Sequence, residues 1–235
     1  MSRLLPTATR RLTIWFVSSA LLLAGCAAGQ PDRTSRVVRV KLVADPALRR
    51  WDPLWRNTAE DLLRTASDYY EERFGIRLAL QAVEAWRVEG TTASSVTLMK
   101  RLKRSYPGAG GALPHDVVIG LTRQPLNFYR GGRARADRFG NCTEGLGNYI
   151  VSHVGESYTY GDELSHDVLA LVHEMGHLLG AVHTDDTESV MHADFDFRTG
   201  FDAPNRAIVM RNRLCPFAEP HKAGQGRHRR TGPGP

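Results

Sequence analysis

The chain has 235 residues, of which 42% are hydrophobic and 24% are charged, so it is long and apolar enough to bury the core of one domain. Its formal net charge is +6, but three arginines lie in the first 26 residues and four Lys or Arg lie in the last 17, which leaves 24 basic and 24 acidic residues elsewhere. A neutral central region lacks the basic footprint of a nucleic-acid-binding domain, so we expect no nucleic-acid partner.

The first 26 residues have the pattern of an export signal. Arg3, Arg10 and Arg11 precede an apolar run over residues 12–24, which is too short for an ordinary membrane span. The run ends in Leu-Ala-Gly-Cys, which resembles the bacterial lipobox, whose cysteine is acylated. We therefore expect Cys26 to be lipidated and to anchor an exported protein at a bacterial envelope. A plain secretory signal that is cleaved nearby is the alternative.

Two polar segments flank the expected domain. Residues 27–35 are small and polar and indicate a tether. Because Ala27 follows the cysteine, rather than the aspartate that often retains lipoproteins at the inner membrane, we expect the outer membrane in a Gram-negative host. Residues 219–235 are rich in Arg, Gly and Pro and predict a disordered basic tail. The domain is therefore expected to span residues 36–218.

Strands and helices alternate along the first part of this domain. Hydrophobic periodicity predicts strands at 36–43, 76–86 and 116–121 and helices at 56–74 and 94–106. This order predicts a twisted, mostly parallel sheet with helices packed on it. Residues 46–53 are expected to be a connection. After the third strand we expect an Arg- and Gly-rich excursion at 122–141, an edge strand at 145–154 and helices at 165–180 and 204–214.

The stretch from His173 to His183 reads HExxHxxGxxH. On a helix, His173 and His177 lie one turn apart on the same face, so both rings can reach one metal ion. Gly180 allows a sharp exit from the helix and brings His183 back as a third ligand, while Glu174 can hold a water in the same site. Three histidines and one water form the open coordination of a catalytic zinc, so we expect one Zn²⁺ ion.

The alternative is that these histidines are ordinary polar positions on a surface helix. With this chain's composition, the full pattern should arise by chance in fewer than about one chain in ten thousand. The context also fits a helix. Ser165 is a good N-cap, and Asp167 lies in the first turn, where the helix dipole favours negative charge. The helix has a wide apolar face, formed by Val168, Leu169, Leu171, Val172, Leu178 and Leu179.

The stretch resembles the active-site helix of the metzincin clan of zinc metalloproteases. Clan members carry a Met-turn beneath the ligands, and Met191, eight residues after His183, has the spacing of the matrixin and adamalysin branches. Because Ala193 occupies the position at which some members carry a tyrosine ligand, we expect no fifth protein ligand. The resemblance implies an α+β fold, with a twisted, mostly parallel sheet and packed helices above a zinc cleft and a small, mainly irregular and helical lower subdomain.

The resemblance also implies a disulfide. Adamalysin-like domains often link the segment before the active-site helix to the C-terminal helix, and Cys142 and Cys215 fall in these two places. If Cys26 carries lipid, they are also an even pair in an exported protein. Two free thiols are the alternative.

By the same resemblance, a peptide substrate adds a strand to the sheet edge. That edge is expected near Gly145, Leu146 and Gly147, with a pocket wall that follows Met191 and runs from Ala193 to Asn205. Calcium has little support, because the acids that follow the Met-turn lack the spacing of a recognised loop: Asp194, Asp196 and Asp202.

The function implied by the resemblance is a zinc-dependent endopeptidase that acts on proteins or peptides. Zinc would act as a Lewis acid on water and on the scissile carbonyl, and Glu174 would act as the general base. The alternative is a non-catalytic binding or adhesion lipoprotein that keeps zinc as a structural element. Glu174 weighs against that alternative, because a structural site needs no base. No oligomeric state is predicted.

Overall fold

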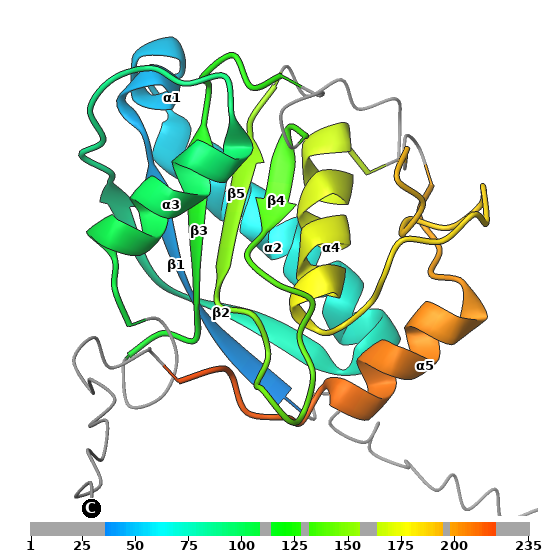
Figure 1. Ribbon diagram of the computed structural model, residues 1–235. Coiled ribbons are helices and arrows are strands. Elements are labelled where there is room, and N and C mark those ends of the chain that lie inside the picture. Colours follow the sequence, from blue (N-terminus) through cyan, green and yellow to red (C-terminus); the bar gives the residue numbers. More distant parts are fainter. Residues whose placement is uncertain (1–35, 109–113, 128–131, 156–163, 195–197, 220–235) are drawn as a thin grey trace, which may run out of the picture. The chain divides into compact units, whose positions relative to one another are not determined.

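A five-stranded sheet organises the described part of the chain (Figure 1). The computed structural model describes residues 36–108, 114–127, 132–155, 164–194 and 198–219. The leader with Cys26, the tether and residues 220–235 of the tail therefore lie outside the described residues. Among the described helices, none is both long and apolar enough to cross a bilayer.

The sheet is mostly parallel, as the sequence predicts. In spatial order its strands are β2 (Ile76–Ala85), β1 (Arg36–Ala44), β3 (Val117–Thr122), β5 (Tyr149–His153) and β4 (Ala134–Ala136). Neighbouring strands are parallel except at one edge, where β4 runs antiparallel to β5. The short β4 strand therefore forms one edge of the sheet, and β2 forms the other.

The sheet is covered on both faces because successive side chains of its strands point to opposite sides. In β3, for example, Ile119 packs into one core cluster while its neighbour Val118 packs into the other. The larger cluster contains residues of α2 (Trp55–Phe74) and α4 (His166–Leu178), and the smaller contains residues of α3 (Ser95–Ser105). Figure 1 shows α3 in front of the sheet and α2 behind it.

The remaining helices are short. Helix α1 (Pro46–Trp51) begins immediately after β1, and α5 (Ala203–Asn212) belongs to the segment that follows α4. The sequence analysis expected residues 46–53 to be a connection. Asp45 caps α1 by accepting a hydrogen bond from Leu48 N at 2.8 Å, and Pro46 stands at the first position, where a missing N–H costs nothing. Six residues are too few to show a helical period, which explains the missed element.

The position of the sheet edge also differs from the expectation. Residues 145–154 were expected at the edge, but β5 pairs on one side with β3 and on the other with β4. The edge strand comes instead from the Arg- and Gly-rich excursion, whose composition gives no strand signal. Its three residues can form a strand because the main-chain groups of β5 on the side away from β3 are available for pairing.

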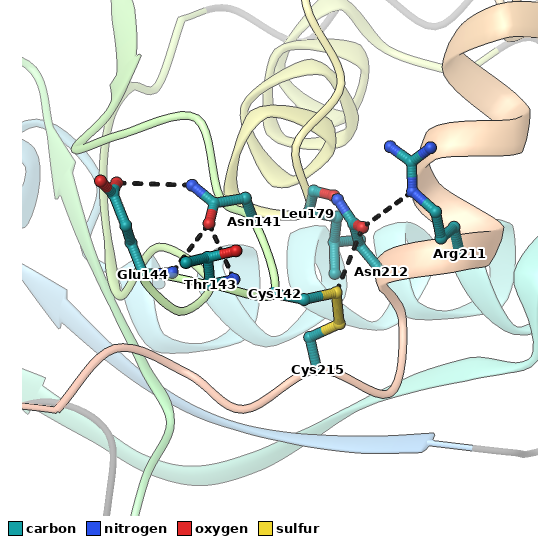
Figure 2. Close-up of a disulfide and its surroundings, with 8 residues drawn as sticks. All are labelled: Asn141, Cys142, Thr143, Glu144, Leu179, Arg211, Asn212 and Cys215. Carbon is teal, nitrogen blue, oxygen red and sulfur yellow. Dashed lines mark hydrogen bonds between the residues drawn. A yellow bond between two sulfur atoms is a disulfide. The ribbon is translucent and has the colours of Figure 1, made fainter.

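A disulfide joins Cys142 to Cys215, the pairing that the resemblance implies. Figure 2 shows this bond between the loop before β5 and the residues immediately after α5. Beside it, the Asn212 side chain donates to Leu179 O at 3.0 Å, so α5 is also tied to the end of α4. The disulfide therefore reinforces the junction between the sheet and the segment that follows α4.

Removal of this bond should destabilise the protein. The two cysteines are 73 positions apart, and the chain-entropy model assigns a loop of this length about 4 kcal/mol. Cys142→Ser combined with Cys215→Ser should therefore lower the free energy of unfolding by about 2–4 kcal/mol in denaturant titrations. Alkylation of the wild type without reductant, followed by intact-mass analysis, should leave both thiols unmodified. Two alkylated cysteines and an unchanged unfolding midpoint would contradict this prediction.

Candidate metal centre

Helix α4 carries the histidine pair in a nearly fully buried position. Ser165 accepts a hydrogen bond from Val168 N at 3.3 Å and so caps its first turn. In the middle of the helix, the buried Tyr70 hydroxyl donates to Val172 O at 2.7 Å, which fixes α4 against α2. All residues of α4 from Asp167 to Leu178 are buried. The helix is therefore held by its surroundings along its whole length.

The end of α4 redirects the chain toward the site. Gly180 N donates to His177 O and Ala181 N donates to Gly176 O, both at 2.9 Å, which is the bond pattern of a Schellman motif. Gly180 has φ +98°, a conformation that other residues rarely adopt, and a Cβ there would lie 2.4 Å from Gly140 O. The turn brings His183 beside the helical pair.

The three histidines converge on one point. The Nε2 atom of His177 lies 3.0 Å from that of His173 and 3.2 Å from that of His183, and the third separation is 3.3 Å. Among the described residues, this triad is the one group of three or more side chains that could hold a metal ion. The structure thus brings together all three ligands that the sequence predicts.

The protonation of the rings shows that a cation fits between them. Nδ1 of His173 lies 2.7 Å from Val190 O, and Nδ1 of His177 lies 2.8 Å from Ala181 O. A carbonyl oxygen only accepts, so both Nδ1 atoms carry the proton and both Nε2 atoms present lone pairs to each other. Tetrahedral zinc with bonds of about 2.0–2.1 Å separates its nitrogen ligands by about 3.3 Å, close to the spacing seen here.

Burial keeps the ligands neutral, as a metal site requires. It lowers the pKa of His173 to about 4 and that of His177 to about 3, because a charged imidazolium is poorly solvated there. Burial also lowers the pKa of His183, which is more exposed. The three rings therefore do not need to lose protons near neutral pH before they bind a cation.

His183 is positioned by a residue that the sequence analysis did not single out for this role. The Asn205 side chain of α5 accepts from Val182 N at 2.8 Å and donates to Val182 O at 2.9 Å. Both main-chain groups of the residue before His183 are thus clamped. Asn205 was expected only at the far end of the pocket wall, and an isolated asparagine gives no sequence signal for this contact.

Met191 lies in a tight turn beneath the ligands, as the resemblance implies. It is fully buried, and its Sδ atom would lie 2.8 Å from a Cβ at position 176. A glycine at this position of α4 therefore lets the turn approach the helix closely. The preceding Val190 supplies the carbonyl that orients His173. The turn thus supports the metal site by packing and by one hydrogen bond.

Glu174 is buried beside the ligands and faces the edge strand. Its Oε2 atom accepts a hydrogen bond of 2.5 Å from the main-chain N–H of Ala136 in β4. Burial raises the pKa of Glu174 to about 8, against the opposing effect of this hydrogen bond and of the Arg135 charge. A nearby cation favours the charged carboxylate. A backbone donor carries no side-chain signal, so the sequence could not reveal Ala136.

A cavity of about 720 Å³ opens at this site. It is lined by the triad, Glu174, the N-terminal half of α4, residues 132–139, His153, Ala193 and Asp194. Its upper rim is therefore β4 and not the predicted Gly145–Gly147 segment. Leu146 is fully buried and pairs with Phe217, and Gly147 packs against Leu178, because β5 takes up the residues that follow as an inner strand.

Three further histidines lie near the motif in the sequence and have other contacts. His153 accepts from Arg133, and His192 contacts Asp194 O, while His166 lines the cavity near the start of α4. Of the acids considered for calcium, Asp202 caps α5 and accepts from Ser189, and Asp196 lies outside the described residues.

Comparisons with known proteins give a family and a similar fold. The sequence profile of metallo-peptidase family M12 matches residues 34–227. The fold is similar to the solved structure of archaemetzincin from Methanopyrus kandleri, with a TM-score of 0.52 and 18% identity over 79% of this chain and 98% of that one. No curated protein sequence matches significantly. At this identity the structural likeness concerns the fold, and it agrees with the predicted metzincin-like architecture.

Gly140, in the loop after β4, provides a test of how closely this loop approaches the end of α4. Gly140 N donates to His177 O at 2.9 Å, and a Cβ at this position would lie 2.0 Å from Leu178 O. Gly140→Ala should therefore destabilise the protein by about 3 kcal/mol or more in urea titrations. Gly200→Ala is the matched control, since no atom of a described residue lies within 4 Å of a Cβ at this position, and it should change stability by less than about 1 kcal/mol. Equal effects of the two substitutions would refute this packing.

Proposed function

The chain belongs to metallo-peptidase family M12, and we propose that it is a zinc-dependent endopeptidase in which Glu174 is the general base. The observation that carries this proposal is the pairing of three neutral imidazoles with a carboxylate at the floor of an open cavity. A purely structural site needs no carboxylate there and is normally closed by a fourth protein ligand.

In this mechanism the histidines, Glu174 and Ala136 have different roles. His173, His177 and His183 would hold the zinc, which supplies Lewis-acid activation of water and of the scissile carbonyl. Glu174 takes the proton of the attacking water on its carboxylate and then donates it to the leaving amine. The Ala136 N–H holds Oε2 of Glu174 in a fixed direction during both transfers. The buried setting strengthens these interactions, because little water competes with them.

The main chain of β4 would hold the substrate. Asp137 N donates to Tyr149 O, and His153 N donates to Arg133 O, so the main-chain groups at 133 and 137 face β5. Because these directions alternate along a strand, the main-chain groups of Ala134 and Ala136 point away from β5. Because the Ala136 N–H already donates to Glu174, a protein or peptide substrate can pair with the main chain of Ala134 and with the Ala136 carbonyl, and so add a strand at this edge beside the metal site.

The role of Glu174 is tested by an isosteric substitution. Glu174→Gln keeps the volume and removes the base, so zinc content and folding should stay nearly intact while peptide hydrolysis falls by at least about 10²–10⁴-fold. His177→Ala removes a ligand and should lose zinc and activity together. The measurement pairs zinc stoichiometry with turnover of an unstructured protein, with and without a chelator.

Two results would overturn this mechanism. If Glu174→Gln cleaves as fast as the wild type, Glu174 is not the base. If the wild type binds zinc stoichiometrically but cleaves nothing in a broad peptide library, the protein is a binding scaffold that retains its metal.

We also propose that Cys26 carries lipid and anchors the enzyme at a bacterial envelope. The support is the run of small residues before a lone cysteine at the end of an apolar segment. Cys26→Ser should move the protein from the membrane fraction to the soluble fraction, or stall its maturation. Ala27→Asp is the matched variant, because it keeps the anchor and should shift the protein to the inner membrane of a Gram-negative host. Normal maturation and membrane association of Cys26→Ser would rule out the anchor.

A further inference from the structure

The edge strand alternates two kinds of side chain. From residue 133 the sequence reads Arg-Ala-Arg-Ala-Asp, and in a strand alternate residues share a face. Ala136 packs against the core cluster that contains α4, whereas Asp137 pairs with Lys103 of α3 at 2.8 Å. Arg133 and Arg135 therefore share the alternate positions of this strand with Asp137, and both line the cavity that contains the histidine triad.

The positive charges on this face are not neutralised within the described part of the chain. The Arg135 side chain is exposed and makes no hydrogen bond or ion pair with a described residue. The exposed Arg133 donates to Nδ1 of His153 at 3.0 Å, and burial lowers the pKa of that ring to about 4, so its partner is uncharged at neutral pH. The one acid on the same face, Asp137, is almost fully covered and already paired.

Acidic residues line the same cavity. Besides Arg133 and Arg135, its lining includes Asp167, Asp194 and the small side chain of Ala170. A peptide strand added to β4 would present alternate side chains to opposite faces of the strand. Every second side chain would stand beside the arginines, and those between would face α4.

We propose that β4 selects acidic peptide segments, in which Asp or Glu at two alternate positions of the substrate stand opposite Arg133 and Arg135. The inference rests on the proposed peptidase function and specifies its substrate class. Opposite charges across neighbouring strands attract at Cβ separations of about 4.5–5.5 Å, and like charges in the same places repel. Lysine at these two positions is therefore disfavoured, and the intervening position gains nothing from an acid.

The test is a position-scanning set of peptides that carry Glu, Gln or Lys at one position at a time. With the full-length zinc-loaded enzyme, kcat/KM should favour Glu over Lys by about 3- to 10-fold at two positions separated by one residue. The preference should shrink at about 1 M salt, where the screening length falls to about 3 Å. Equal kcat/KM for Glu and Lys at every position would overturn the proposal.

Charge reversal shows which arginine acts on which of the two substrate positions. Arg133→Glu and Arg135→Glu should each invert the preference at one position and leave the other unchanged. Arg87→Glu is the matched control, because Arg87 is exposed and does not line the cavity, and it should alter neither preference. The comparison uses ratios between peptides, since Arg135 also acts electrostatically on Glu174 and that effect cancels. Retention of both preferences in the double reversal would refute the role of the arginines.

Binding separates this inference from the proposed function. Fluorescence anisotropy with the zinc-loaded Glu174→Gln variant measures the affinity for the same peptides without cleavage. If the wild type cleaves no peptide but the acidic peptides bind tighter, the peptidase proposal fails and the acidic selectivity stands. If peptides are cleaved and the acidic ones neither bind tighter nor react faster, the selectivity fails and the peptidase proposal stands.

Discussion

The convergence of three imidazole lone pairs in a largely buried place is the constraint on which this structure depends. Two rings are fixed because each donates a hydrogen bond from Nδ1–H to a carbonyl oxygen, so their Nε2 atoms carry no proton and cannot hydrogen-bond to each other. Burial prevents the rings from relieving this arrangement by taking up protons. A cation at the centre resolves both difficulties at once, and the surrounding fold is arranged to keep the three rings in position.

This site combines ligands from two parts of the chain, the helix α4 and the irregular segment that follows it. The sheet and α2 support α4, which carries His173 and His177, whereas His183 belongs to the irregular segment beyond the helix. Asn205 and Asn212 of α5 tie the main chain of this segment and of the helix end, and the disulfide secures α5 to the loop before β5. The geometry of the third ligand is therefore set mainly by contacts from α5, far along the sequence from the ligand motif.

The edge strand couples the metal site to the substrate. The Ala136 N–H of β4 orients Glu174, and the other main-chain groups that point away from β5 can pair with a peptide. Arg133 and Arg135 line the same cavity as the ligands, so the charge that would select a substrate stands near the carboxylate that would act on it. Substrate binding, orientation of Glu174 and substrate selectivity would therefore all depend on this one short strand.

The sequence by itself determined those features that depend on short-range spacing. The four- and ten-residue intervals between the histidines, the glycine that ends the helix and the alternation of apolar residues in β1 and β3 are local patterns, and the predicted helix, strands and triad follow from them. The cysteine pair required a resemblance in addition, since spacing alone does not assign a partner. Only the tertiary structure decided which strand forms the edge, that Gly145–Gly147 lie away from the cleft, and that Ala136 N–H and Asn205 serve the site. These features have no periodic sequence pattern. A three-residue strand, a backbone donor or a close glycine contact depends on partners that are distant in the sequence and come near only when the chain folds.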